Sequence, residues 1–171
     1  FNRIKAVARQ IQESLQIPPG GTIALSFPHV DLDFITAFFG CLMAGVNVIS
    51  VAQPDHSTKG EMIQFKSLGV QCVLTTSLLA KNSGKKDEGK RFNLWQSIKV
   101  TTPSKTQPPS KWRVDPSRVS SGKLLMFRRS AGQITTITTT QESLSTQLNI
   151  MAQTTGLSSS SRVLSLESHS N

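Results

Sequence analysis

The chain has 171 residues, 37% of them hydrophobic, which is enough for one domain with an apolar core. Its formal net charge of +9 favours phosphate-rich or other anionic partners but does not determine a fold. Two cysteines, Cys41 and Cys72, exclude a disulfide framework and, without a signal peptide, indicate buried, reduced thiols in a cytoplasmic protein.

The first predicted element is an amphipathic helix, because its apolar residues recur at i, i+3 and i+4 spacing. These residues are Ile4, Val7, Ala8, Ile11 and Leu15. The run PPGG at residues 18–21 ends the helix. Thr22–Phe27 is a short apolar run that predicts a buried strand.

Residues 31–51 predict a helix that stops at a glycine and leads directly into a strand. Asp31 is a good N-cap, and Gly45 can take the left-handed conformation that ends a helix. Almost every residue between them is apolar, so we expect this helix to be covered on most sides. Val46–Val51 is typical of a parallel strand that is buried on both faces. A membrane span is the alternative, but glycines and polar residues interrupt the run of about 20 apolar residues that a span needs.

The next elements continue this alternation. Glu61–Leu68 predicts a short helix, and Val70–Thr75 predicts a strand. Helices that alternate with strands indicate a three-layer α/β fold, in which a doubly wound, mostly parallel sheet carries helices on both faces. We therefore expect residues 1–171 to form a single subdomain. Because the chain starts at Phe1 without a methionine, we expect it to be a fragment of something larger.

The composition changes between residues 81 and 121, where lysine, serine and proline dominate. We expect a long basic surface excursion there, with only a little strand near residues 94–100. The remaining expected elements are a strand at 124–127, a turn at 128–133, a strand at 134–139, a helix at 141–154 and a strand at 162–166. The inner side of that helix is expected to hold Leu144, Leu148, Ile150 and Met151.

One loop offers candidate chemistry, although the phosphate motifs GxGxxG and GxxxxGK[ST] are both absent. In the segment FRRSAGQ, residues 127–133, Arg128 and Arg129 can bind an anion and Ser130 can donate a hydrogen bond. A plain hairpin turn with two solvated arginines is the alternative, and residue types alone favour it. Neither the histidines nor the cysteines show metal-ligand spacing, and no GxSxG elbow supports a nucleophilic triad.

Nucleic-acid binding is another interpretation of the basic excursion. Its cations are interleaved with Phe92, Trp95 and Trp112, as in single-strand binders that combine stacking with phosphate pairing. The charges follow no helical or strand period, however, and no RNA-binding motif is present. A solvated loop is therefore the favoured interpretation.

Several stretches together resemble the adenylate-forming enzymes, in particular the fatty acyl-AMP ligases and the ligase-like domains of disco-interacting proteins. The densest match is GGTIALSFPHVDLDFITAFFGCLMAGVNVISVAQP, residues 20–54. The segment LGVQCVLTTSLL, residues 68–79, is similar to the family's next helix end and strand, and Trp112 matches its tryptophan before the central hairpin. Residues 123–143 occupy the place of the family's phosphate loop, and residues 141–171 resemble the helix, strand and acyl-pocket loop that follow.

The phosphate loop departs from the family pattern. Active members read roughly [YF]-T-S-G-[ST]-T-G-x-P-K-G-V, whereas residues 127–137 read FRRSAGQITTI, with the family's lysine falling on Thr135. The resemblance implies an ATP site that is degenerate, in a family that also uses Mg²⁺. The residues that it assigns are Arg128, Arg129, Ser130 and Gly132 for the phosphates and His169 near an acyl pocket. The family's magnesium glutamate and catalytic lysine would fall beyond Asn171, so this piece alone is expected to be inactive.

Three functions follow from these observations. The resemblance implies a diverged fatty acyl-AMP ligase-like domain of lipid metabolism, whose parent reaction converts a carboxylate and ATP to acyl-AMP and pyrophosphate. Whether the protein is an enzyme stays open. The alternative is a non-catalytic module that holds an acyl group or a protein partner, and a weaker alternative is a basic nucleic-acid-binding domain.

Overall fold

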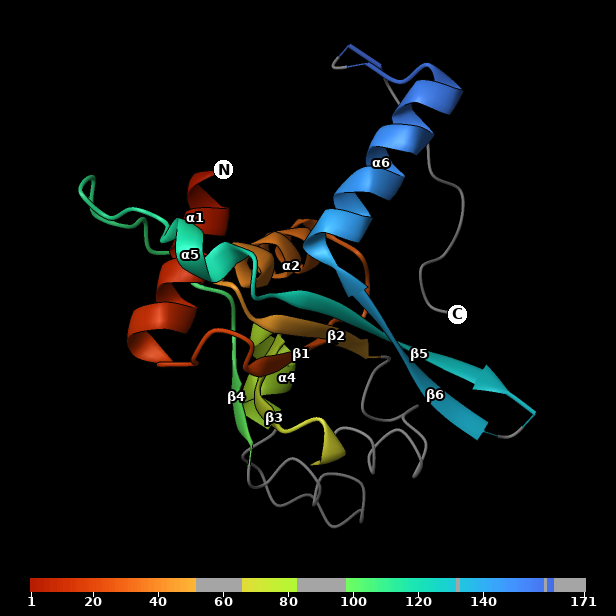
Figure 1. Cartoon of the computed structure of the whole chain (residues 1–171). Coiled ribbons are helices and arrows are strands. Elements are labelled where there is room, and N and C mark those ends of the chain that lie inside the picture. Colours follow the sequence, from red (N-terminus) through yellow and green to blue (C-terminus); the bar gives the residue numbers. More distant parts are fainter. Residues whose placement is uncertain (52–65, 83–97, 132, 159, 162–171) are drawn as a thin grey trace.

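The computed structural model of the chain describes residues 1–51, 66–82, 98–131, 133–158 and 160–161, without the side chains of residues 129 and 130. These residues form a six-stranded sheet with helices packed against it (Figure 1). In spatial order the strands are β4 (Lys99–Thr101), β3 (Val70–Thr75), β1 (Thr22–Ser26), β2 (Asn47–Val51), β5 (Lys123–Ser130) and β6 (Gln133–Thr140).

The sheet is doubly wound and mostly parallel, as the sequence predicts. β1 lies in the middle and pairs in parallel with β2 on one side and β3 on the other. The chain moves from β1 to β2, then crosses back to β3 and on to β4, while β5 extends the other half beside β2. Only β6 runs antiparallel to its neighbour. This order confirms the α/β class, and it arises because each crossover connection returns the chain to a parallel strand.

Two helices cover one face of the sheet. α1 (Asn2–Arg9) continues into a π-helical turn, η1 (Gln10–Ser14), and packs beside α2 (Leu32–Ala44) (Figure 1). The two helices approach closely at Gly40, where an added Cβ would lie 2.6 Å from Val7. A small residue is needed at this crossing because any side chain would overlap the valine.

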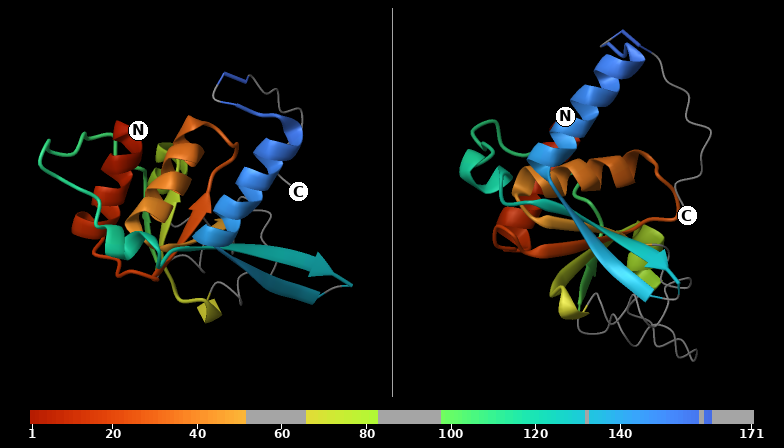
Figure 2. Two further views of the ribbon diagram at one scale, coloured as in Figure 1. Left: turned by 45° about the horizontal axis from the view of Figure 1, so that its top comes forward. Right: turned by 45° about the vertical axis from the view of Figure 1, so that its right-hand side comes forward.

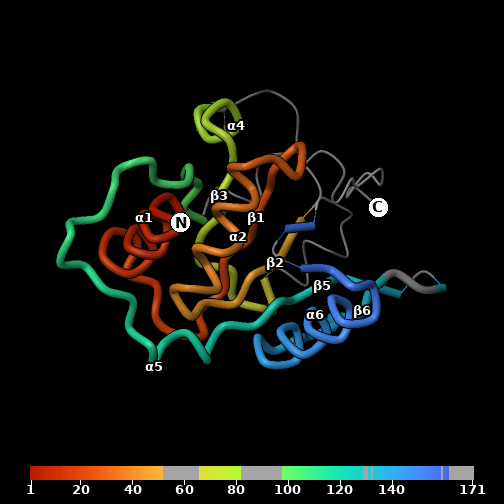
Figure 3. Tube along the Cα trace, turned by 90° about the horizontal axis from the view of Figure 1, so that it is seen from above, coloured from red at the N-terminus to blue at the C-terminus, as the bar shows by residue number. Residues whose placement is uncertain are grey.

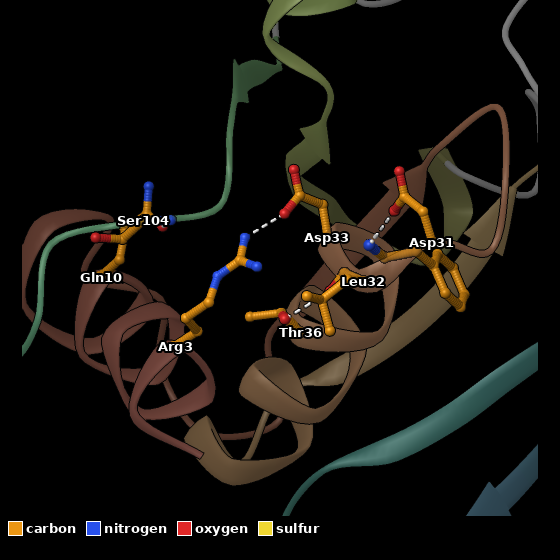
Figure 4. A network of polar contacts seen from close by, with 8 residues as sticks. Arg3, Gln10, Asp31, Leu32, Asp33, Thr36 and Ser104 are labelled. Carbon is orange, nitrogen blue, oxygen red and sulfur yellow. Dashed lines mark hydrogen bonds and ion pairs between the residues drawn. The ribbon is translucent and has the colours of Figure 1, made fainter.

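The predicted boundaries of α2 are confirmed. The Asp31 carboxylate accepts a hydrogen bond from the Phe34 N–H at 2.9 Å, which caps the first turn, and Asp33 pairs with Arg3 of α1 (Figure 4). Gly45 ends the helix with φ of +74°. As expected, this helix is covered on most sides. The sheet, α1 and residues 116–119 contact it, and the exposed residues of the helix form one stripe, namely Leu32, Ile35 and Phe39.

Each face of the sheet has its own apolar core. Alternation along β1 sends Ile23 and Leu25 to the face under α1 and α2, and Ala24 to the opposite face, where it packs with Ile49 and Val73. Partly buried residues complete this second cluster, namely Leu68, Ile98, Val100 and Phe127. Burial on both faces explains why these strands are continuous apolar runs rather than alternating ones.

The basic excursion contains more order than the sequence predicts. Residues 98–121 hold β4 and a helical turn, α5 (Pro116–Val119), and the segment 102–121 runs round the outside of α1 (Figure 3); we call it the strap. Gln10 fastens it: its side-chain N–H donates to the Thr102 carbonyl at 2.9 Å, and its Oε1 accepts from the Ser104 N–H at 2.7 Å. A further helix, α4 (Ser77–Asn82), follows β3, while residues 83–97 lie outside the described residues.

The last described helix, α6 (Gln141–Thr155), starts at the capping side chain of Thr140 and ends at Gly156 with φ of +68°. The predicted inner side is mostly wrong. Leu144 packs against the core, but Leu148, Ile150 and Met151 are exposed, because α6 rises away from the sheet (Figure 1). A helical period indicates which residues share a side of a helix; it does not supply an element to cover that side.

Two predicted elements are left without a test. The helix at 61–68 falls mostly outside the described residues, and the strand at 162–166 falls wholly outside them. Within the described ranges, no helix is long and apolar enough to cross a membrane.

Candidate functional site

The candidate phosphate segment is part of a two-stranded ribbon formed by β5 and β6. The strands pair in unbroken antiparallel register from Lys123 opposite Thr140 to Ser130 opposite Gln133. Only residues 131 and 132 connect them, and Ala131 has a positive φ of 49°. The predicted turn at 128–133 is therefore too long, because pairing continues to the last residue before a two-residue connection. Such tight connections require positive φ, which Ala131 adopts although it is not glycine.

The base of the ribbon is held by the core, and its outer part is not. Leu125 is buried, and Phe127 is half-buried against the second apolar cluster. The tip of the ribbon projects from the rest of the sheet (Figure 1). On the opposite side of the ribbon, Met126 and Ile137 face each other across the strands and are 43% and 40% exposed. Cross-strand pairing with β6 therefore positions the segment that carries the arginines.

The structure places the predicted site residues as follows. Arg128, Arg129 and Ser130 lie in β5 opposite Thr135, Ile134 and Gln133, and the side chain of Arg128 is exposed. Gly132 and His169 lie outside the described residues. The assignment of these five residues to a phosphate site and an acyl pocket stays a prediction.

This geometry does not fit a triphosphate in the way that a glycine-rich loop does. A phosphate-wrapping loop turns repeatedly so that successive backbone N–H groups converge on one point, whereas β5 is extended through Ser130. Thr135, which falls in the place of the family's lysine, uses its hydroxyl to donate to the Arg128 carbonyl across the ribbon at 3.4 Å. The Arg128 guanidinium is a planar cation that can pair with a phosphate from its exposed position.

A polar contact that the sequence did not predict holds the ribbon and α6 to the rest of the fold. The side-chain N–H₂ of Gln141 donates to the Leu42 carbonyl at 2.9 Å and to the Val119 carbonyl at 2.6 Å. Gly122 passes beside this amide, where an added Cβ would lie 3.0 Å from the Gln141 nitrogen. A glutamine in the first turn of a helix is an ordinary residue in a sequence, so only the tertiary structure reveals this link.

The two cysteines are free and buried, as predicted. Burial raises the pKa of the Cys72 thiol to about 11, with Lys99 opposing the shift, and it raises the pKa of Cys41 further. Both thiols therefore stay protonated at neutral pH. Because the thiolate is the reactive form, neither is suited to act as a nucleophile or as a metal ligand.

Two other chemistries, metal binding and base stacking, have no assembled site among the described residues. In the part of the chain that the structure describes, no three His, Cys, Asp or Glu side chains gather closely enough to hold a metal ion. Trp112 is half-buried against the core under α1 and α2 rather than free to stack on a base, and Phe92 and Trp95 lie outside the described residues.

Comparison with solved structures shows which fold this is. A fatty acyl-adenylate ligase structure, from a study of the E. coli and L. pneumophila enzymes, matches with a TM-score of 0.70 and 17% identity, over 98% of this chain and 31% of that one. The nonribosomal peptide synthetase FmoA3, in its AMPPNP-bound form, matches with a TM-score of 0.75 and 15% identity, over 99% of this chain and 17% of its own. The chain therefore has the fold of the adenylate-forming enzymes.

Sequence comparison points to a particular set of relatives. The chain is 26% identical over 162 residues to disco-interacting protein 2 homolog B of Mus musculus, and 33% identical over 107 residues to the Homo sapiens homolog. These matches span 88% and 57% of this chain, but only 10% and 7% of the relatives. The chain is thus similar to about a tenth of a much longer protein. No family model matches it.

Proposed function

We propose that the chain is the N-terminal subdomain of a fatty acyl-AMP ligase-like domain that acts in cytoplasmic fatty-acyl metabolism with a degenerate ATP phosphate site. The observation that supports this is the ribbon, which carries the segment that the sequence resemblance assigns to the family's phosphate loop and leaves Arg128 as an exposed cation. The fold of fatty acyl-adenylate ligases supports the substrate class. The parent reaction would join a carboxylate to AMP and release pyrophosphate.

Arg128 would bind one phosphate by paired N–H donors, in place of the backbone cradle that the ribbon lacks. Among the described residues, no three His, Cys, Asp or Glu side chains gather to hold Mg²⁺. A weakened cradle lowers the rate without changing the reaction, since removal of a single oxyanion donor costs an enzyme roughly 100-fold or more. We therefore expect slow formation of acyl-AMP by the full-length protein.

The test incubates the full-length protein with ATP and a panel of fatty acids and measures acyl-AMP by mass spectrometry. We expect slow acyl-AMP formation, with an apparent ATP affinity that falls about tenfold or more in Arg128→Ala, as loss of a charge-assisted hydrogen bond predicts. Lys123→Ala, an exposed cation at the other end of the same strand, is the matched control and should leave it unchanged. If Arg128→Ala forms acyl-AMP with the same apparent ATP affinity as the unaltered protein, the phosphate site lies elsewhere.

A complete lack of acyl-AMP with every fatty acid would remove the ligase function. The second candidate would then stand, namely a non-catalytic module that holds an acyl group or a protein partner. The extended pairing of Arg128 and Arg129 favours that candidate, because an extended ribbon does not wrap around a nucleotide as a loop does. Binding of a radiolabelled fatty acid without ATP would separate an acyl-holding module from a protein-binding one.

A further inference from the structure

One face of the β5–β6 ribbon combines apolar residues with a cation. Because residues alternate along a strand, Met126 and Arg128 share a face, while Phe127 belongs to the other face and packs on the second apolar cluster. Across the ribbon, Met126 lies opposite Ile137, and Arg128 lies opposite Thr135. Register therefore places these two pairs next to each other on one face, which we call the Met126 face.

The apolar pair of the Met126 face is exposed. Met126 and Ile137 are 43% and 40% exposed, and the side chain of Arg128, two residues further along β5, is exposed as well. The ribbon that carries them extends away from the other strands, as the left view of Figure 2 shows. One ligand can therefore reach the cation and the apolar pair together.

The charges of the ribbon favour a single anionic group on this face. No aspartate or glutamate occurs between Asp115 and Glu142, so no carboxylate of the ribbon competes for the guanidinium of Arg128. That guanidinium can pair with a phosphate through two parallel N–H donors. Strand alternation assigns Lys123 and Arg129 to the opposite face. Charge complementarity on the Met126 face therefore points to one phosphate rather than to a triphosphate.

The spacing along β5 indicates what this phosphate carries. Two residues separate Met126 from Arg128, which is a rise of roughly 7 Å in an extended strand. If Arg128 held one end of a triphosphate, further charged phosphates would lie against Met126 and Ile137 and would lose hydration without gaining a partner. An alkyl chain joined to a single phosphate would instead lay its first carbons on the pair and remove apolar surface from water.

We propose that the Met126 face binds a long-chain phosphate ester, with its single phosphate on Arg128 and the start of its alkyl chain across Met126 and Ile137. This inference rests on the proposed assignment of Arg128 to a phosphate, and it adds the class of ligand. It gives a role to two exposed apolar side chains that binding of ATP does not use. Binding involves no group transfer, so it does not depend on whether the protein forms acyl-AMP.

The test titrates dodecyl phosphate into the full-length protein by calorimetry, below the concentration at which this compound forms micelles. Methyl phosphate supplies the same head without the chain, and dodecanoate supplies a chain with a carboxylate head. We expect dodecyl phosphate to bind at least about tenfold more tightly than methyl phosphate, because a few methylene groups leave water. ATP should bind at least about tenfold more weakly than dodecyl phosphate, because it places charge on the apolar pair.

Variants assign the binding to the ribbon. Ile137→Thr keeps a β-branched residue in the strand and should weaken dodecyl phosphate about threefold or more, without changing the affinity for methyl phosphate. Arg128→Gln should weaken both compounds about tenfold, because the charged donor is lost. The matched control is Val30→Thr, since Val30 is 41% exposed and lies outside the ribbon. This control should change neither affinity.

Four results would overturn the proposal. Affinities that Ile137→Thr and Arg128→Gln leave unchanged would place the ligand elsewhere in the protein, and equal binding of methyl and dodecyl phosphate would remove the chain. Tighter binding of dodecanoate would replace the phosphate by a carboxylate, and binding that starts only above the micelle concentration would assign the ribbon to a lipid surface. A protein that forms no acyl-AMP but binds dodecyl phosphate through these residues would lack the ligase function and keep this site.

Discussion

Gly45 meets two separate demands at the end of α2. Its φ of +74° is a left-handed conformation that costs other residues about 1 kcal/mol or more, and a Cβ there would lie 1.9 Å from the Arg118 carbonyl oxygen. The first demand is visible in the sequence, as a glycine after a helical run. The second depends on the strap, which returns to this point more than 70 residues later in the chain.

Comparing two glycines separates these demands. Gly69 also has a left-handed φ, of +62°, but nothing lies within 4 Å of an added Cβ. We expect Gly69→Ala to lower the free energy of unfolding by about 1 kcal/mol, and Gly45→Ala to lower it by a further 1–3 kcal/mol or so, because the strap must move. Urea unfolding of the two variants measures the difference. Equal losses would show that the close approach of α5 to Gly45 does not matter.

The buried thiols predict a dependence of stability on pH. Their pKa values are raised in the folded state, so the folded chain keeps protons that the unfolded chain loses above a pKa of about 9.0. Stability is therefore complete below pH 9 and falls as pH rises toward 11, by about 1.4 kcal/mol per pH unit for each thiol. Urea titrations at several pH values should show a shallower fall for Cys72→Ala than for the unaltered chain. Parallel curves would contradict the raised pKa.

At the scale of elements, the ribbon shows which features of a strand a local sequence pattern can predict. Seven consecutive β-branched residues, 134–140, predict the second strand of the ribbon well. The length of the first strand was underestimated, because Arg128, Arg129 and Ser130 have no strand preference of their own and are extended by pairing with β6. The conformation of the candidate phosphate segment is thus imposed by its neighbour.

The Gln141 amide is expected to fasten α6 to the sheet layer. Gln141→Ala leaves the Leu42 and Val119 carbonyls without this donor, and two lost hydrogen bonds should cost about 2 kcal/mol. Hydrogen exchange of α6 should accelerate accordingly. The matched control is Gln147→Ala, an exposed glutamine on the same helix, which should change exchange little. Similar acceleration in both variants would mean that the helix, and not the contact, was weakened.

At the scale of the whole molecule, the start of the chain supplies the helices that cover one face of the sheet. The face under α1 and α2 is covered by helices that the first 45 residues supply. The exposed apolar residues then collect on the outer sides of α2 and α6, away from that core.

The sequence by itself determined the types of α1, α2 and α6 and of β1, β2 and β3, the caps at Asp31 and Gly45, and the doubly wound α/β class. These depend on spacing, β-branching and turn residues within short segments. It also selected Arg128 and Arg129 as the departure from the family's phosphate loop. Only the tertiary structure decided that these arginines lie in a strand, that α2 and α6 keep an uncovered side, and that Gln10 and Gln141 fasten distant segments. Those features depend on contacts between residues far apart in the chain, which no local period encodes.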